Sequence, residues 1–249
     1  MIFRQLYEPL SSTYTYLLGD EDTGLAILID PVIATMDRDL AEVHRLGLKL
    51  AYTVDTHIHA DHITAALEMK RAVGSKIAAP AHDRQSCTDV GIEEGKPFQV
   101  GGITLQPLHT PGHTDGHFAY LFNDRVFTGD ALLIEGCGRT DFQNGDADAL
   151  YKSVREKLFA LPDETLVYPA HDYKERFVSS IAQEKKRNPR LGGDMSIEAF
   201  RQIMANLNLP YPKFIDYAVP GNRQCGMCPP DLPENLANYC RQMTESPQG

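Results

Sequence analysis

Apolar and polar positions follow two different periods along the chain, and this pattern predicts an α/β fold. Short runs of β-branched, aromatic and aliphatic residues, bounded by Gly, Pro, Asn or Asp, are typical of strands. Apolar residues spaced three apart, such as Leu40, Val43 and Leu46, are typical of one face of a helix. The predicted strands cover residues 13–18, 25–30, 48–53, 76–79, 103–108, 118–122, 126–128 and 165–168, and the predicted helices cover residues 37–46, 63–73, 148–161, 176–187 and 196–207.

The domain organisation is expected to be simple. The chain has 249 residues, of which 42% are hydrophobic, so it can bury a full core without further support. We find no internal repeat and no linker composition, which favours a single domain over residues 1–249. The Pro-rich tail from about residue 210 is expected to be irregular.

Charge and hydropathy exclude several classes of partner. The 24 Lys and Arg against 34 Asp and Glu leave a net charge of −10, which opposes binding to nucleic acid. No apolar run approaches the roughly 20 residues of a membrane span. The first residues also lack the basic and apolar stretches of a secretory signal, so we expect no membrane association and a cytoplasmic location.

The five cysteines are an odd number, which argues against a disulfide framework. Cys225 and Cys228 have the spacing of a zinc or redox pair, but no second ligand pair accompanies them and two prolines follow. We therefore expect ordinary thiols at both positions, and a buried structural thiol at Cys137.

Histidine and aspartate residues gather where predicted strands end. The strand over 48–53 leads into residues 57–62 (HIHADH), where His57 and His59 face the same side if the chain is extended. Turns after later strands add His113, Asp130 and His171. Imidazole and carboxylate groups are donors that iron, zinc and manganese accept. The candidate metal ligands are therefore His57, His59, Asp61, His62, His113, Asp130 and His171.

These motifs together resemble the metallo-β-lactamase superfamily. The resemblance rests on residues 56–62 (THIHADH), 111–113 (PGH), 128–130 (TGD) and 169–172 (PAHD). It implies an αββα sandwich, an α/β fold with metal at the edge between two sheets. Residues 132–143 (LLIEGCGRTDFQ) further resemble the persulfide dioxygenases of this superfamily.

The dioxygenase resemblance implies one Fe(II) per chain, held by His57, His113 and Asp130, with one face of the metal open. Glutathione persulfide and O₂ would bind on that face, and the products would be sulfite and glutathione. His59, Asp61, His62 and His171 would then lie beside the iron or be remnants of a second metal site. All seven positions that bind two metals in hydrolytic relatives are present, so the sequence leaves the choice between one iron and two metals open.

Glutathione carries net negative charge, so its pocket should contain cationic side chains. Arg139 follows Asp130 in a Gly-rich segment, while Tyr173, Lys174 and Arg176 follow His171. These four residues are the candidates for binding the carboxylates of the tripeptide.

Three alternatives compete with this interpretation. A dinuclear zinc thioesterase of the glyoxalase II type shares the motifs and also uses glutathione, with a metal-bound hydroxide as the nucleophile. An RNA nuclease of the same fold is disfavoured by the acidic charge. A non-catalytic binding module would be expected to have lost ligands, and none is missing. The oligomeric state is open, with a homodimer as one option.

Overall fold

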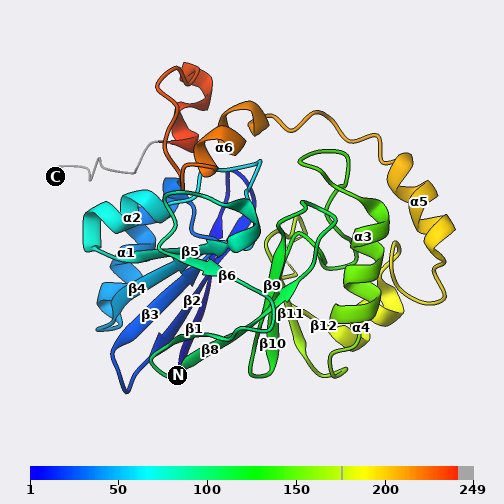
Figure 1. The fold of residues 1–249 in the computed structure, drawn as a ribbon, viewed down its shortest axis with the longest axis horizontal. Helices are drawn as coiled ribbons and strands as arrows, with labels where there is room; N and C mark the ends of the chain where they lie inside the picture. Colours follow the sequence, from blue (N-terminus) through cyan, green and yellow to red (C-terminus); the bar gives the residue numbers. More distant parts are fainter. Residues whose placement is uncertain (175, 241–249) are drawn as a thin grey trace. The chain divides into compact units, whose positions relative to one another are not determined.

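The structure is a computed structural model that describes residues 1–174 and 176–240. The described residues form two compact units (Figure 1). The first unit consists of residues 1–92, 99–104 and the described residues from 211, and the second consists of residues 93–98 and 105–210. Within the described residues, no helix has the length and apolar character needed to cross a membrane.

The first unit contains a six-stranded mixed sheet. In spatial order its strands are β1 (Ile2–Glu8), β2 (Thr13–Asp20), β3 (Leu25–Ile29), β4 (Lys49–Val54), β5 (Lys76–Pro80) and β6 (Val90–Ile92). The first three strands pair antiparallel, and β3 to β6 pair parallel. Parallel strands need crossover segments between them. The segment from β4 to β5 is the crossover that contains the first histidine motif.

Helices cover one face of this sheet (Figure 1). Val43 of α1 (Met36–Arg45) and Met69 of α2 (Ala66–Val73) are buried in one cluster with Leu28 and Leu50 of the strands. Ala218 of α6 (Ile215–Asn222) belongs to the same cluster. Three short helical turns complete this unit, η1 (Ile33–Thr35), η2 (Ala81–Asp83) and η4 (Glu234–Tyr239).

The second sheet also has six strands. In spatial order they are β12 (Ser179–Ser180), β11 (Leu166–Pro169), β10 (Arg125–Gly129), β9 (Phe118–Phe122), β8 (Ile103–His109) and β7 (Phe98–Val100). Strands β8, β9 and β10 pair antiparallel, whereas β10 and β11 pair parallel.

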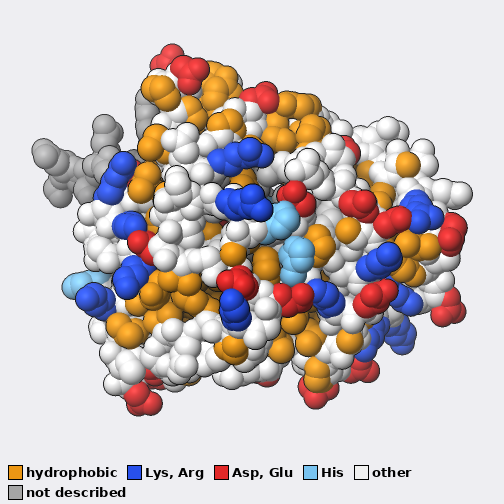
Figure 2. All heavy atoms as spheres, viewed as in Figure 1, with side chains coloured by type: hydrophobic (Ala, Val, Ile, Leu, Met, Phe, Trp, Pro, Cys, Tyr) orange, Lys and Arg blue, Asp and Glu red, His pale blue; other side chains and the backbone are white. Residues whose placement is uncertain are grey.

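The helices of the second unit pack on its sheet. They are α3 (Ala147–Lys152), which continues as the π-helical turn η3 (Ser153–Leu158), α4 (Ile181–Arg187) and α5 (Ile197–Ala205). Leu150, Ile181 and Phe200 from these helices are buried in one cluster with Val126 and Val167 of the strands. Figure 2 shows a face on which acidic and basic side chains are interspersed over these helices.

Some predicted helices begin later than expected. The helix predicted over 176–187 begins at Ile181, because Ser179 and Ser180 pair with β11 and the Ser180 side chain caps α4. The helix predicted over 63–73 begins at Ala66, because the main chain of Ile63 and Thr64 bonds to residues 32–33 instead.

Two further expectations are wrong. The tail was expected to be irregular, yet α6 forms there because Phe214 and Ala218 pack into the core of the first unit. The cysteines were expected to be thiols, yet Cys87 bonds to Cys225 and Cys228 bonds to Cys240. The fold brings their Cα atoms to 6.1 Å and 5.7 Å, within the range that disulfides require, although the first pair is 138 residues apart in sequence. Among the described residues, Cys137 is the free cysteine, and it is buried as expected.

Candidate metal centre

The first histidine of the motif is oriented by a chain of buried hydrogen bonds. After β4, Thr56 donates its main-chain N–H to Asp30 Oδ1 (2.7 Å) and its hydroxyl to Asp30 Oδ2 (2.9 Å). The Thr56 hydroxyl oxygen lies 2.9 Å from His57 Nδ1, and because the hydroxyl donates its hydrogen to Asp30, the oxygen accepts a hydrogen bond from the N–H of that nitrogen. His57 therefore carries its proton on Nδ1, which leaves the Nε2 lone pair suited to a metal ion.

His59 is held differently. Its Nε2 lies 3.1 Å from Asp30 Oδ1, and both side chains are buried. Burial lowers the pKa of His59, but the carboxylate of Asp30, with Asp61 and Asp55 contributing less, raises that pKa to about 9. The same nitrogen cannot both donate to Asp30 and bind a metal ion. Burial also raises the pKa of the neighbouring Asp55 to about 7.

The end of the motif forms a second histidine–carboxylate pair. His62 Nδ1 lies 3.0 Å from Asp61 Oδ2, and the Thr13 hydroxyl lies 3.3 Å from the same carboxylate oxygen. One ligand atom from each of His59, Asp61 and His62 lies within 4.8 Å of the others, a spacing that fits a metal ion. The ring centroids of His57 and His59 are 4.1 Å apart. The motif therefore gathers its imidazoles as its spacing predicts.

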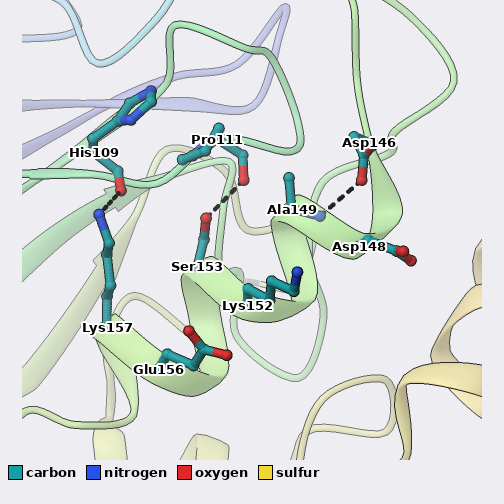
Figure 3. Close-up of a pocket in the computed structure, with 9 residues that line it drawn as sticks. All are labelled: His109, Pro111, Asp146, Asp148, Ala149, Lys152, Ser153, Glu156 and Lys157. Atoms are coloured by element: carbon teal, nitrogen blue, oxygen red, sulfur yellow. Dashed lines mark hydrogen bonds between the residues drawn. The ribbon is translucent and has the colours of Figure 1, made fainter.

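In the second unit, His113 follows Pro111 and Gly112 on a turn that is anchored to the segment of α3 and η3. Figure 3 shows Pro111 beside Ser153 of η3. Ser153 donates its hydroxyl to the Pro111 carbonyl (2.7 Å), and the main-chain N–H of Asp146 donates to the Gly112 carbonyl (2.8 Å). Gly112 has φ 136°, and a Cβ there would lie 2.2 Å from the Leu150 nitrogen, so only glycine fits. The turn borders a groove of about 380 Å³, which contains none of the predicted metal ligands.

The His113 ring is oriented by a main-chain carbonyl. Its Nδ1 lies 2.8 Å from the Arg139 carbonyl oxygen, which can only accept, so Nδ1 carries the proton. Its Nε2 lies 3.4 Å from Asp130 Oδ2, and His171 Nε2 lies 3.5 Å from Asp130 Oδ1. The carboxylate thus has one imidazole nitrogen near each of its two oxygens.

Asp130 follows β10 at a fixed backbone position. Its main-chain N–H donates to His117 Nε2 (3.0 Å), while His117 Nδ1 bonds to the Thr110 hydroxyl (2.8 Å). Its carbonyl accepts from the Gly138 N–H (2.7 Å). Among the described residues, the buried Asp130 Oδ1 accepts no hydrogen bond. A buried carboxylate oxygen normally has a partner, so this one fits a bound cation.

The segment over 132–143 is held by side chains from later in the chain. Arg190 donates to the Cys137 carbonyl (2.8 Å), and Asn188 donates to the Gly136 carbonyl (2.9 Å). Burial raises the pKa of the Cys137 thiol to about 11, so this cysteine is an inert core residue. The segment is therefore a rigid support for the carbonyl of Arg139 that orients His113.

The four predicted substrate-binding residues differ in how they are engaged. The Arg139 guanidinium forms a two-point ion pair with Asp141 (2.6 and 2.7 Å) and donates to the Pro210 carbonyl (2.8 Å). The Arg176 guanidinium bonds to Asp172 (2.7 and 3.0 Å), Glu135 (2.8 Å) and the Ile134 carbonyl (2.7 Å). Lys174 and Tyr173 are exposed beside His171.

Sequence reasoning missed two residues that orient the histidine motif, Asp30 and Asn222. Asp30 ends a predicted strand just before Pro31, a position that could have marked it as a turn carboxylate. Asn222 lies in the tail and has no sequence signal, yet its side chain bonds to the main chain of the motif.

Comparisons with known proteins agree with this chemistry. The pattern of the metallo-beta-lactamase superfamily matches residues 9–171. Human "Persulfide dioxygenase ETHE1, mitochondrial" is 47% identical over 232 residues, covering 92% of this chain and 91% of that protein. The crystal structure of ETHE1 from Myxococcus xanthus is 56% identical, with a TM-score of 0.89, and covers 91% of this chain and 100% of that one.

A hydrolytic relative is more distant. "Hydroxyacylglutathione hydrolase" from Methylococcus capsulatus is 36% identical over 179 residues, covering 69% of this chain and 68% of that protein. The metallo-β-lactamase type of α/β fold predicted from the sequence is confirmed by these matches. The chain belongs to the metallo-beta-lactamase superfamily and, within it, to the persulfide dioxygenase family.

Proposed function

We propose that this chain is a persulfide dioxygenase that oxidises glutathione persulfide with O₂ and water to sulfite and glutathione. The observation that carries this proposal is the 47% identity to persulfide dioxygenases over 92% of the chain. The reaction balances, because sulfite takes two oxygen atoms from O₂ and one from water, and the terminal sulfur gives four electrons to O₂.

The proposed cofactor is one Fe(II) per chain, held by His57, His113 and Asp130. Two imidazoles and a carboxylate are the donor set of mononuclear iron oxygenases. When bound, Fe(II) supplies the redox chemistry that joins a persulfide to O₂. The protein contributes orientation: His57 and His113 each have their Nδ1 proton directed to an oxygen acceptor, which presents Nε2. Asp130 contributes a carboxylate, and the position of this residue is fixed because its main-chain N–H and its main-chain carbonyl are both hydrogen-bonded.

Two histidine–carboxylate pairs lie inside the first unit, where His59 Nε2 is bonded to Asp30 and His62 Nδ1 is bonded to Asp61. The other ring nitrogen of His59 forms no hydrogen bond with the described residues, so its pairing with Asp30 is compatible with one metal ion or with two. The resemblance to the persulfide dioxygenases implies one iron, and on that ground we assign His59, Asp61, His62 and His171 to the surroundings of the iron.

For the substrate, we propose that Lys174 and Tyr173 contact the glutathione moiety, and that Arg139 and Arg176 also contribute to this binding site. The ammonium of Lys174 is exposed, which suits a carboxylate ligand. Arg139 is already paired with Asp141, so a substrate carboxylate would have to replace Asp141 as the partner of the Arg139 guanidinium. Arg176 has more partners than Arg139, so its contribution would be to hold the loop that presents Tyr173 and Lys174.

The alternative is a dinuclear zinc thioesterase of the glyoxalase II type. The hydroxyacylglutathione hydrolase relative is less similar to this chain than the persulfide dioxygenases are, in both identity and coverage. The two functions are separated by metal content and by oxygen consumption.

The test is metal analysis of anaerobically purified protein, paired with oxygen uptake on addition of glutathione persulfide. We expect close to one iron per chain, O₂ consumption, and inhibition by added zinc, which binds such ligands tightly but lacks redox chemistry. Two zinc ions per chain with hydrolysis of a glutathione thioester and no oxygen uptake would refute the proposal.

The ligand assignment is tested by five single replacements with alanine. His57→Ala, His113→Ala and Asp130→Ala should empty the iron site. His62→Ala and His171→Ala should keep much of the iron and lose activity more gradually, by about 10- to 100-fold. Equal loss of metal in all five variants would indicate a dinuclear site instead.

The single domain, the homodimer and the cytoplasmic location stay predictions. Limited proteolysis, light scattering and cell fractionation test them in turn. The human, bovine and mouse persulfide dioxygenases are named as mitochondrial.

A further inference from the structure

The side chain of Asn222 reaches the histidine motif from the opposite end of the sequence. Its Nδ2 donates to the carbonyl oxygens of His59 (2.9 Å) and His62 (2.7 Å). Its Oδ1 accepts from the main-chain N–H of Thr64 (2.9 Å). The residue is buried, and about 160 positions separate it from these partners. The amide nitrogen and the carbonyl oxygen of the Asn222 side chain thus both form hydrogen bonds with the main chain of residues 59–64.

That segment needs support from outside itself. Residues 55–63 belong to neither a helix nor a strand, so their carbonyls are not paired in a regular ladder. Leaving a buried main-chain carbonyl without a hydrogen-bond partner destabilises the conformation in which it occurs. Asn222 supplies the donors for two of these carbonyls and thereby selects the backbone conformation of the segment.

Asn222 is itself firmly held at the end of α6. Cys225, three residues further on, is joined to Cys87 by a disulfide, and its carbonyl accepts from the Leu67 N–H (3.0 Å). Gly226 has φ 96°, and a Cβ there would lie 2.0 Å from the Thr64 carbonyl oxygen. The turn after α6 therefore lies directly against the end of the histidine segment, within the first unit.

We propose that Asn222 is a positioning residue for the metal site, acting through the main chain of the segment that carries His57, His59 and His62. The side chain does not contact the metal or the substrate. It holds the backbone from which the imidazoles project, so its loss lowers metal affinity by allowing that backbone other conformations. This inference rests on the proposed role of His57 as a ligand.

The test is the dissociation constant for Co(II), measured under anaerobic conditions by competition with a chelator on the full chain. We expect Asn222→Ala to weaken Co(II) binding by about 10- to 100-fold, the usual effect of residues that support metal ligands. Asn222→Ser, which keeps one donor in a smaller side chain, should fall between Asn222→Ala and the wild type and serves if the alanine variant does not fold. The visible absorption bands of bound Co(II) should also change, because they report ligand geometry.

A matched control separates positioning from general destabilisation. Val43→Ala removes buried side-chain volume from the same core of the first unit, at a position of α1 that is not part of the histidine segment. It should lower the melting temperature without weakening Co(II) binding or altering the absorption bands. If the Asn222 variants bind Co(II) within twofold of Val43→Ala and show unchanged bands, the inference is wrong.

The His57→Ala variant shows whether a negative result concerns the proposed ligand set or only the role of Asn222. If His57→Ala loses Co(II) binding while the Asn222 variants keep it, the proposed ligand set stands and this inference alone fails. If His57→Ala binds Co(II) as tightly as the wild type, the proposed ligand set is wrong and this inference fails with it.

Discussion

Replacing Gly138 by alanine should damage the metal centre without touching a ligand. A Cβ at this position would lie 2.6 Å from the Asp130 carbonyl oxygen and 2.8 Å from His113 Nδ1. Gly138 also donates its N–H to that Asp130 carbonyl (2.7 Å), and the carbonyl of the next residue, Arg139, accepts a hydrogen bond from His113 Nδ1–H. One added methyl group therefore competes with the two hydrogen bonds that place Asp130 and orient His113.

The expected magnitude follows from the cost of overpacking. Extra carbon atoms in a filled site cost about 1–3 kcal/mol. A free-energy difference of about 1.4 kcal/mol corresponds to a factor of ten in a dissociation constant. If the added methyl group destabilises the conformation that binds the metal by this overpacking energy of about 1–3 kcal/mol, metal affinity falls by about 5- to 150-fold. The assay is iron content and Co(II) dissociation constant, with kcat and KM for glutathione persulfide measured on protein loaded to the same iron content.

Gly136→Ala is the matched control in the same segment. A Cβ there would meet the Leu133 Cβ at 3.8 Å and the Ile134 carbonyl at 4.0 Å, which are ordinary contacts. Neither Gly136 nor Gly138 has a positive φ, so alanine introduces no backbone strain at either position. The reasoning is refuted if Gly138→Ala retains metal affinity within twofold of Gly136→Ala while remaining folded.

Three further outcomes are expected. Burial raises the pKa of Asp39 to about 6 from 3.8, so the folded protein favours the protonated carboxyl more than the unfolded chain does. This stabilisation is present at acid pH and is lost as the pH rises through 6. In urea unfolding, the stability of Asp39→Asn relative to wild type should therefore increase by up to about 3 kcal/mol between pH 4 and pH 7, and a constant difference would contradict this. Cys87→Ser opens the disulfide to Cys225 and should lower stability by about 2–5 kcal/mol without reductant, whereas reductant should abolish the difference in melting temperature. Arg139→Ala should raise KM for glutathione persulfide with iron content unchanged and kcat modestly affected, and Arg139→Lys should recover part of the loss; an unchanged KM would exclude substrate contact.

Much of the fold could be predicted from local pattern. The strands over 118–122 and 165–168 and the helix over 37–46 correspond to β9, β11 and α1, because each has a periodic apolar face and clear breakers at its ends. The missed strand β1 has its apolar residues in adjacent pairs instead of at alternate positions, and it is an edge strand whose residues are mostly exposed or half-buried, so its strand signal is weak. Helix α6 contains Pro220 and forms through tertiary packing rather than propensity.

The candidate metal ligands could also be read from the sequence, because side chains two positions apart in extended chain face the same side and turns follow strand ends. The four candidate ligands within the HIHADH motif lie together in the first unit, and His113, Asp130 and His171 lie together in the second. For substrate binding, the sequence indicated cationic residues but could not show that Asp141 and Asp172 already pair with two of them.

What the sequence determined by itself is the chemistry: the ligand types, the strand ends that carry them, and the family. What only the tertiary structure decided is how each imidazole is oriented and which of them is already paired. The Arg139 carbonyl, Asp30 and Asn222 set these orientations, and each of them forms a hydrogen bond that involves the main chain. Every residue has the same main-chain groups, so such contacts leave no trace in residue type or spacing. The disulfide between Cys87 and Cys225 is hidden for the related reason that 138 residues separate its ends, and only folding brings them within bonding distance.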